Sequence, residues 1–231
     1  MSDLNERLLN EIVDAVKGLI RKETADRLRD VYVVGDIEKD MAKGVIERLR
    51  ELSNDSRRPI MVYINSAGGN VTDGLAIHDV ITHLVSTGIE VTIVVQGMAY
   101  SMGSVVLQAA SPGRRFAYPH SWIMIHEPAK WAGWQSTTAA AQHLDRLKQM
   151  QSQIYRIMAN RSGKPLRQII RDTKRVDFYL DAWKAKEYGL VDHVLGVDIQ
   201  PERESENAAN DEADAPEAPP AEITIHGRSQ S

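Results

Sequence analysis

Residues 59–70 read PIMVYINSAGGN, an apolar run that ends in a pair of glycines. Its β-branched and apolar side chains are typical of a strand buried on both faces. A helical pattern of apolar residues follows at once, at Leu75, Ile77, Val80, Ile81 and Leu84. A strand joined to a helix by a short link is the repeating unit of a parallel sheet.

The same alternation extends in both directions from this stretch. Strands are predicted over Val31–Gly35, Ile89–Val95 and Trp122–Ile125. Helices are predicted over Asp40–Leu52 and Met102–Ala110. The sequence therefore predicts an α/β domain, a mostly parallel sheet covered by helices.

Three further segments lie beyond this alternation. Residues 136–159 predict a long helix, with one apolar stripe at Ala140, Leu144, Leu147, Met150, Ile154 and Ile157. Residues 1–24 predict an amphipathic N-terminal helix. Residues 198–231 are rich in Pro, Glu, Ala, Asp and Asn and predict a disordered tail. The expected domain thus spans residues 25–197.

The charge is unevenly distributed along the chain. The formal net charge is −4, yet residues 201–231 alone carry eight acids and two bases, so the preceding body is close to neutral. Such a body does not suggest nucleic-acid binding. The absence of Cys excludes disulfides and thiolate chemistry. Without a membrane-length apolar run or a signal-peptide pattern, a cytoplasmic protein is expected.

Chemistry is expected at the carboxyl ends of the strands, where α/β sheets place their sites. Two of these ends carry small residues. The first is Asn65–Gly69, whose paired glycines can leave backbone N–H groups uncovered, as an oxyanion hole requires. The second is Gly97–Gly103, in which Ser101 precedes an apolar helix whose N-terminus can stabilise negative charge. Ser101 is a candidate nucleophile, although a helix-capping serine is the commoner use.

The third strand end carries His126, directly after the strand and two residues before Pro128, and therefore at the rim of the sheet. Beside a candidate nucleophile, it is a candidate general base. A triad also needs a carboxylate to orient the imidazole. Spacing alone leaves three candidates open, Asp172, Asp177 and Asp181. The residues thus predict a serine hydrolase.

Taken together, these motifs resemble the proteolytic subunit of the ATP-dependent Clp protease, the ClpP family. The resemblance runs from about Val31 to Leu195. The matching motifs, in order, are GDI at 35–37, YINSxGG at 63–69, GxAxSMG at 97–103, GRRF at 113–116, MIHxP at 124–128, RDT at 171–173 and AxEYGLVD at 185–192.

The resemblance implies the ClpP/crotonase fold of repeated ββα units, with residues 136–159 as a protruding "handle" helix. It also implies two stacked heptameric rings of identical subunits around a chamber. Unfolded polypeptides reach that chamber through a partner AAA+ Clp unfoldase. ATP is used by that partner, so this subunit is expected to need no cofactor and no metal.

Carried over by position, the resemblance implies that Ser101 is the nucleophile and His126 the general base. The backbone N–H groups of Gly69 and Met102 would form the oxyanion hole. Substrate backbone would pair beside these groups, with the expected binding residues Gly68, Asn70, Val71 and Pro128.

The residue that supplies the orienting carboxylate must be aligned from its C-terminal side, because Val176 is a one-residue insertion relative to the family pattern. Aligned back from Glu187–Leu190, Asp177 falls on the triad position. The chain departs from the family at its ends also, since an amphipathic helix stands where pore loops are usual and the acidic tail is long.

The expected function is that of a serine endopeptidase acting on unfolded proteins and peptides. Four alternatives are weighed against it. A catalytically silent ring subunit would typically lose one of Ser101, His126 and the carboxylate, and all are present. A ClpP-like viral capsid-maturation (prohead) protease is considered because the chain departs from the family at its tail and N-terminal helix. An acyl-CoA enzyme of the crotonase superfamily would need neither Ser101 with His126 nor the handle. A membrane-bound signal-peptide peptidase would need a spanning segment.

Overall fold

The computed structural model describes residues 29–127 and 137–196, which belong to a compact unit spanning residues 1–198. The helix expected over residues 1–24 and the tail expected over residues 198–231 lie outside the described residues. Pro128 also lies outside them. The predictions for these segments stay predictions.

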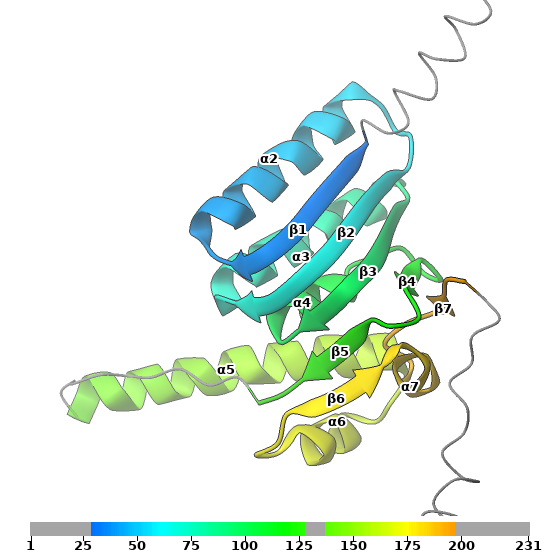
Figure 1. Cartoon of the computed structure of the whole chain (residues 1–231). Coiled ribbons are helices and arrows are strands. Elements are labelled where there is room, and N and C mark those ends of the chain that lie inside the picture. The colour runs from blue at the N-terminus through cyan, green and yellow to red at the C-terminus, as the bar shows by residue number, and fades with distance from the viewer. Residues whose placement is uncertain (1–28, 128–136, 197–231) are drawn as a thin grey trace, which may run out of the picture. The chain divides into compact units, whose positions relative to one another are not determined.

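The described residues form one sheet of seven strands (Figure 1). Its main path runs β1-β2-β3-β4-β7, with every neighbouring pair parallel, which confirms the predicted α/β class. These strands are β1 (Asp30–Ile37), β2 (Ile60–Gly69), β3 (Val91–Tyr100), β4 (Arg115–Ala117) and β7 (His193–Val194).

Two strands branch from this path at the far end of β3. The strand β5 (Trp122–Ile125) pairs with β3 in parallel, and β6 (Phe178–Asp181) pairs with β5 in antiparallel. In that pair Ile125 lies opposite Phe178. Because His126 follows Ile125 and Asp177 precedes Phe178, the pairing brings these two side chains to the same end of the strands.

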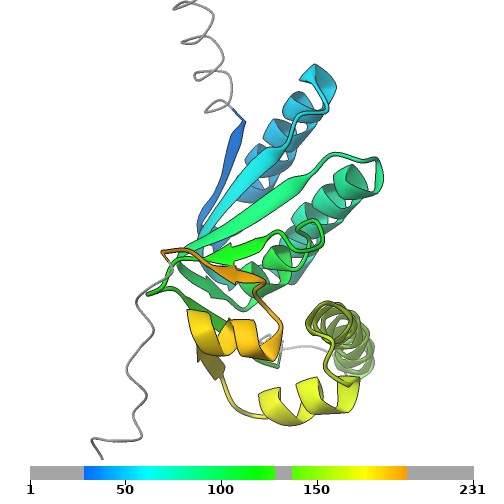
Figure 2. The ribbon, with the colours of Figure 1, turned by 90° about the vertical axis from the view of Figure 1, so that its right-hand side faces the viewer.

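Three helices cover one face of the sheet, as Figure 2 shows. They are α2 (Lys39–Asp55), α3 (Val71–Ser86) and α4 (Met102–Leu107). The core lies between these helices and the sheet. In β2 the alternate residues Ile60, Val62 and Ile64 are fully buried there, so every second side chain of this strand faces the helices.

The strands β2 and β3 continue through two segments that the sequence predicted as loops. The strand β2 runs to Gly69 and β3 to Tyr100. Their pairing register shifts between Ile64 and Ser66, so bulges absorb the glycine-rich sequence within the strands. The paired glycines therefore belong to β2 and not to a link after it. They extend the strand toward Ser101.

The long helix expected from residue 136 is α5 (Thr137–Ser162). Ile154, Tyr155 and Met158, near its C-terminal end, are buried, whereas Leu144, nearer its start, is 51% exposed. Figure 1 shows that this first part extends beyond the sheet, as expected of a handle helix. Two short helices complete the described chain, α6 (Leu166–Thr173) and α7 (Ala182–Tyr188).

Candidate active site

Ser101 lies at the junction of β3 and α4, with backbone angles φ 49° and ψ −119°. A non-glycine residue at positive φ is strained and is held there only by its surroundings. Here the Ser101 N–H donates to the Met124 carbonyl (2.9 Å), and the Ser104 hydroxyl donates to the Ser101 carbonyl (2.6 Å). The Ser101 hydroxyl makes no capping bond to α4, so it is available for another partner.

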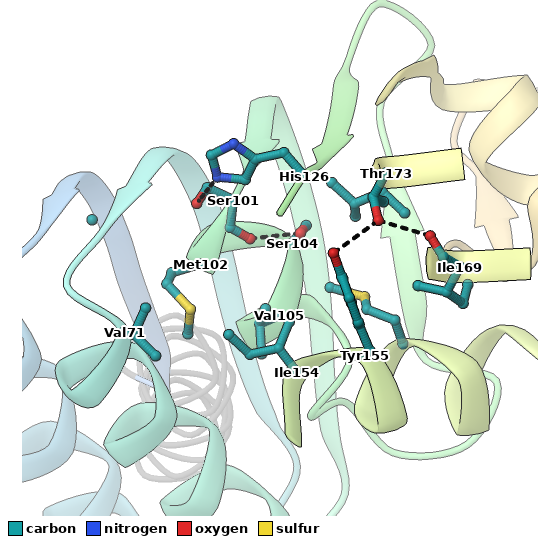
Figure 3. A pocket seen from close by; sticks show the side chains of 13 residues that line it. Val71, Ser101, Met102, Ser104, Val105, His126, Ile154, Tyr155, Ile169 and Thr173 are labelled. Carbon is teal, nitrogen blue, oxygen red and sulfur yellow. Dashed lines mark hydrogen bonds between the residues drawn. The ribbon is translucent and has the colours of Figure 1, made fainter. Parts of the chain in front are cut away.

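That partner is His126. The Ser101 Oγ lies 2.8 Å from His126 Nε2 (Figure 3). The contact follows from the sheet, because Tyr100 of β3 pairs with Met124 of β5 and places the ends of the two strands together. The distance is that of a short hydrogen bond between a hydroxyl and an imidazole.

Of the three candidate carboxylates, the structure brings only Asp177 to His126. The His126 Nδ1 lies 3.1 Å from Asp177 Oδ1. The Asp172 carboxylate instead accepts from the Tyr188 hydroxyl (2.8 Å), and Asp181 caps α7 by accepting from the Lys184 N–H. The inserted Val176 is 54% exposed, and Arg175 before it takes φ 61°, so the turn before Asp177 absorbs the extra residue.

The contact between Tyr188 and Asp172 is structural. Burial, the hydrogen bond to Asp172 and the charge of that carboxylate together raise the pKa of Tyr188. The phenol therefore stays neutral and serves as a donor to Asp172. This bond links α7 to α6, the helix that precedes Asp177.

The glycine pair lies against Ser101. A Cβ atom on Gly68 would be 2.6 Å from the Ser101 Cβ and 3.0 Å from the Met102 nitrogen. A Cβ atom on Gly69 would be 2.4 Å from the carbonyl oxygen of Ile37. Only glycine fits at either position, because φ is +100° at Gly68 and +144° at Gly69.

Ser66, which the sequence did not single out, holds this glycine strand in place. Its buried hydroxyl donates to the Gly35 carbonyl (2.6 Å) and accepts from the Gly68 N–H (3.1 Å). It thus joins the bulge of β2 to β1. A serine in a strand carries no sequence signal for such a role.

A cavity of about 250 Å³ opens beside Ser101 and His126. Gly69, Val71 and Met102 also line it, so three more of the predicted site residues lie together there. The rest of its wall is mostly apolar and comes from α4, β5, α5 and α6 (Figure 3), from Val105, Ile125, Ile154, Met158 and Ile169. The sequence did not predict this wall, since its residues come from distant segments.

Asn70 has a structural role at the start of α3. Its side-chain oxygen accepts from the N–H groups of Thr72 and Asp73 and so caps α3. Its backbone N–H donates to the Ile37 carbonyl (2.7 Å), and its carbonyl accepts from Gly74. A contact of Asn70 with substrate stays a prediction.

Within residues 29–127 and 137–196, no group of three or more His, Asp or Glu side chains is placed to hold a metal ion. Within the same residues, no helix has the length and apolar character needed to cross a membrane.

A hydroxyl, an imidazole and a carboxylate in a row, beside glycine N–H groups and an apolar cavity, form a site of the serine-hydrolase type. Comparison with known proteins agrees. A family model described as Clp protease matches residues 17–198. An ATP-dependent Clp protease proteolytic subunit from Ligilactobacillus salivarius (strain UCC118) is 40% identical over 170 residues, 72% of this chain and 83% of the relative.

A solved structure is also similar, that of a point mutant of ClpP1 from Listeria monocytogenes. It aligns with a TM-score of 0.66 at 31% identity, over 76% of this chain and 95% of the other. The chain belongs to the Clp protease family and is a serine peptidase. The resemblance inferred from the motifs and the expected fold are thereby confirmed.

Proposed function

We propose that the chain is the proteolytic subunit of a self-compartmentalised, ATP-dependent protease, and that it cleaves unfolded polypeptides and peptides through Ser101, His126 and Asp177. The observation that carries the proposal is the row of two hydrogen-bond distances, 2.8 Å from Ser101 to His126 and 3.1 Å from His126 to Asp177. The name of the L. salivarius relative supports it.

In the proposed reaction, Ser101 Oγ attacks the carbonyl carbon of the scissile bond while His126 Nε2 takes the hydroxyl proton. Asp177 accepts a hydrogen bond from the Nδ1–H of His126, fixes that tautomer and stabilises the imidazolium that forms. His126 then gives its proton to the leaving amine. In the second half, water, deprotonated by His126, attacks the acyl-enzyme, and Ser101 regains its proton as the carboxylic acid leaves.

The negative charge of the tetrahedral intermediate falls on the former carbonyl oxygen. We assign its stabilisation to the backbone N–H groups of Gly69 and Met102. Both residues line the cavity beside Ser101, and the Met102 N–H belongs to the first turn of α4. Fixed donors of this kind stabilise developing charge without reorganisation.

The apolar cavity is proposed to take the side chain that precedes the scissile bond. Its volume of about 250 Å³ and its aliphatic and thioether lining favour a large apolar side chain. Extended substrate backbone would lie along Gly68–Val71 and the segment that begins at Pro128, which favours binding with little dependence on sequence.

The assembly is proposed to be two heptameric rings of this chain, with an AAA+ Clp unfoldase as partner and the cytoplasm as location. Leu144, on the first part of α5, is 51% exposed. A large apolar side chain exposed on a protruding handle helix supports burial between subunits. ATP would be consumed by the unfoldase, and no cofactor is assigned to this subunit.

Labelling with a fluorophosphonate probe, followed by native mass measurement, tests the proposal. We expect covalent labelling of the wild type, no labelling of Ser101→Ala, and a particle of 14 subunits in both. The variant Ser53→Ala is the control, since Ser53 lies on α2 and its hydroxyl donates to the Arg50 carbonyl of the same helix, so its loss should leave labelling unchanged. A well-formed ring that takes no label would instead identify a silent subunit.

A further inference from the structure

We infer that Tyr155 of α5 is a positioning residue for the catalytic pair His126 and Asp177, acting through a chain of hydrogen bonds that runs from Glu127 to Thr173. The inference rests on the proposed function, because it assigns how that same site is held in register. Glu127 follows His126 directly, and Thr173 is the last residue of α6, four residues before Asp177.

These hydrogen bonds run from Glu127, just after β5, by way of α5 to Thr173 at the end of α6. The Gln151 Nε2 lies 3.0 Å from Glu127 Oε1 and 3.2 Å from the Tyr155 hydroxyl. The Tyr155 hydroxyl lies 3.1 Å from Thr173 Oγ1, which donates to the Ile169 carbonyl at 2.8 Å. Figure 3 shows the buried end of this chain beside the cavity.

The hydrogens available fix the direction of every bond. Thr173 has one hydroxyl hydrogen and places it on the Ile169 carbonyl, so Tyr155 must donate to Thr173 Oγ1. The Tyr155 oxygen then accepts one Gln151 N–H, and the second Gln151 N–H goes to the Glu127 carboxylate. Each hydroxyl and amide hydrogen in this series then has one acceptor, which makes the geometry specific.

The catalytic pair needs such support because solvent surrounds part of it. The side chains of His126 and Asp177 are 29% and 53% exposed. Pairing of Ile125 with Phe178 fixes one side of the pair. The other side depends on the position of the end of α6, where Thr173 is fully buried and Tyr155 is 5% exposed.

Tyr155 also lines two cavities. One is the apolar cavity beside Ser101, and the other is a cavity of about 420 Å³ lined as well by Glu127, Gln151 and the cations of Lys148, Lys174 and Arg175. A phenylalanine keeps the ring of this shared lining residue, whereas the hydroxyl makes the hydrogen bonds. Tyr155→Phe therefore removes the bonds and keeps the wall.

The test compares Tyr155→Phe with the wild type in particles of equal mass. We expect kcat for a short peptide and the rate of fluorophosphonate labelling to fall about tenfold, because displacement of catalytic groups lowers the rate steeply, with KM changed less than twofold. A looser contact with Asp177 stabilises the imidazolium less. The acid limb of the kcat/KM profile should therefore move to lower pH.

Matched variants separate the hydroxyl chain from general packing. Thr173→Val, which keeps the shape of the side chain and removes its hydroxyl, should reproduce Tyr155→Phe, and Thr173→Ser should retain the wild-type rate and pH limb. Because both bonds belong to one chain, the double variant Tyr155→Phe/Thr173→Val should be no slower than either single variant. On α5, Gln151→Leu should slow labelling, whereas Gln153→Leu should not.

An unchanged labelling rate and pH limb in Tyr155→Phe would overturn the inference, as would a rate loss with an unmoved pH limb, which is the mark of a packing defect. Either result would leave the proposed function intact if Ser101→Ala still abolishes labelling. If the wild type takes no label at all, the proposed function fails and the inference fails with it.

Discussion

At the scale of single residues, the site depends on backbone positions that few side chains can occupy. Ser101 is held at φ 49° by bonds to Met124 and Ser104, and Gly68 lies so close to it that a methyl group does not fit. Sequence motifs identified Ser101, His126 and the glycines. They did not show why only glycine fits there, because the obstacles are the backbones of Ile37 and Tyr100 in other strands.

The first prediction separates two nearby carboxylates. Asp177→Ala should lower kcat/KM of peptide hydrolysis by about 10³-fold, since the carboxylate that orients the imidazole is lost. Asp172→Ala should lower kcat/KM by less than about tenfold, because Asp172 accepts a hydrogen bond from Tyr188 and contributes to the stability of the fold. Initial rates with a fluorogenic peptide measure both. Equal losses would show that the assignment of Asp177 is wrong.

The second prediction concerns the contact between Gly68 and Ser101. Gly68→Ala should abolish labelling of Ser101, because the added Cβ would be 2.6 Å from the Ser101 Cβ and 2.8 Å from the Tyr100 carbonyl oxygen. Gly113→Ala is the matched control, since Gly113 also has positive φ (73°) but open space around it. The control should lose about 1 kcal/mol of stability and keep its labelling rate. Equal labelling in the two variants would contradict the steric argument.

At the scale of elements, a buried arginine ties the last strand to the sheet. Arg115 of β4 bonds Asp192, just before β7, through Nε (3.0 Å), Nη2 (2.6 Å) and its backbone N–H (2.9 Å). Its remaining guanidinium nitrogen donates to Gln108 and to the Gly189 carbonyl. Strands as short as β4 and β7 need such a bond to hold their pairing.

The third prediction follows from this pair. Burial works against the ionised form of Asp192, but the hydrogen bonds and charge of Arg115 outweigh it and hold the pKa of Asp192 below its ordinary value. The stability from this group is therefore present above the unfolded pKa, near 4, and is lost as the pH falls through the lower folded pKa. Asp192→Asn should cost about 2 kcal/mol at pH 7.

Urea unfolding at several pH values measures this effect. The difference between Asp192→Asn and the wild type should shrink below about pH 4, where the wild-type carboxylate also becomes neutral. Asp55→Asn is the control, because Asp55 also pairs with a buried arginine, Arg29, but is itself 66% exposed. A pH-independent difference at Asp192 would show that its charge does not contribute.

The observed strands and helices show which elements the apolar periodicity of the sequence could predict. Within residues 29–127 and 137–196, the strands and helices that the sequence predicted have the predicted type, but β2 and β3 end later than predicted. A pair of glycines after an apolar run usually makes a turn, whereas here neighbouring strands hold both glycines in an extended bulge. Four short elements were not predicted, namely β4, α6, β6 and α7. Each has three to eight residues, which is too few for a clear period of apolar residues.

At the scale of the whole molecule, α5 connects the cavity beside Ser101 with a surface that we propose is buried in the assembly. Its buried end carries Tyr155 and part of the wall of the cavity, and its first part presents Leu144 to solvent. The motif resemblance predicted this helix, and its role between rings stays a prediction. The cavity wall could not be predicted, because it forms only when α4, α5 and α6 pack together.

The fourth prediction tests the open stripe of α5. Leu144→Glu should yield folded chains that no longer form the 14-subunit particle, because a charge would be buried in an apolar interface. Gln142→Glu adds the same charge two residues earlier, about 200° around the helix, and should assemble normally. Native mass spectrometry counts the subunits, and circular dichroism confirms folding. Normal assembly of Leu144→Glu would exclude this stripe from the interface.

The strand β6 lies late in the sequence, so the order of translation determines when the proposed site can be completed. The contact between His126 and Asp177 joins residues 51 positions apart. At about 5–20 residues per second, the ribosome adds Asp177 about 3 to 10 seconds after His126. During that interval the growing chain carries the proposed nucleophile and base but lacks the proposed carboxylate and the strand that presents it. Translation order thus delays completion of the proposed site until nearly the whole domain has been synthesised.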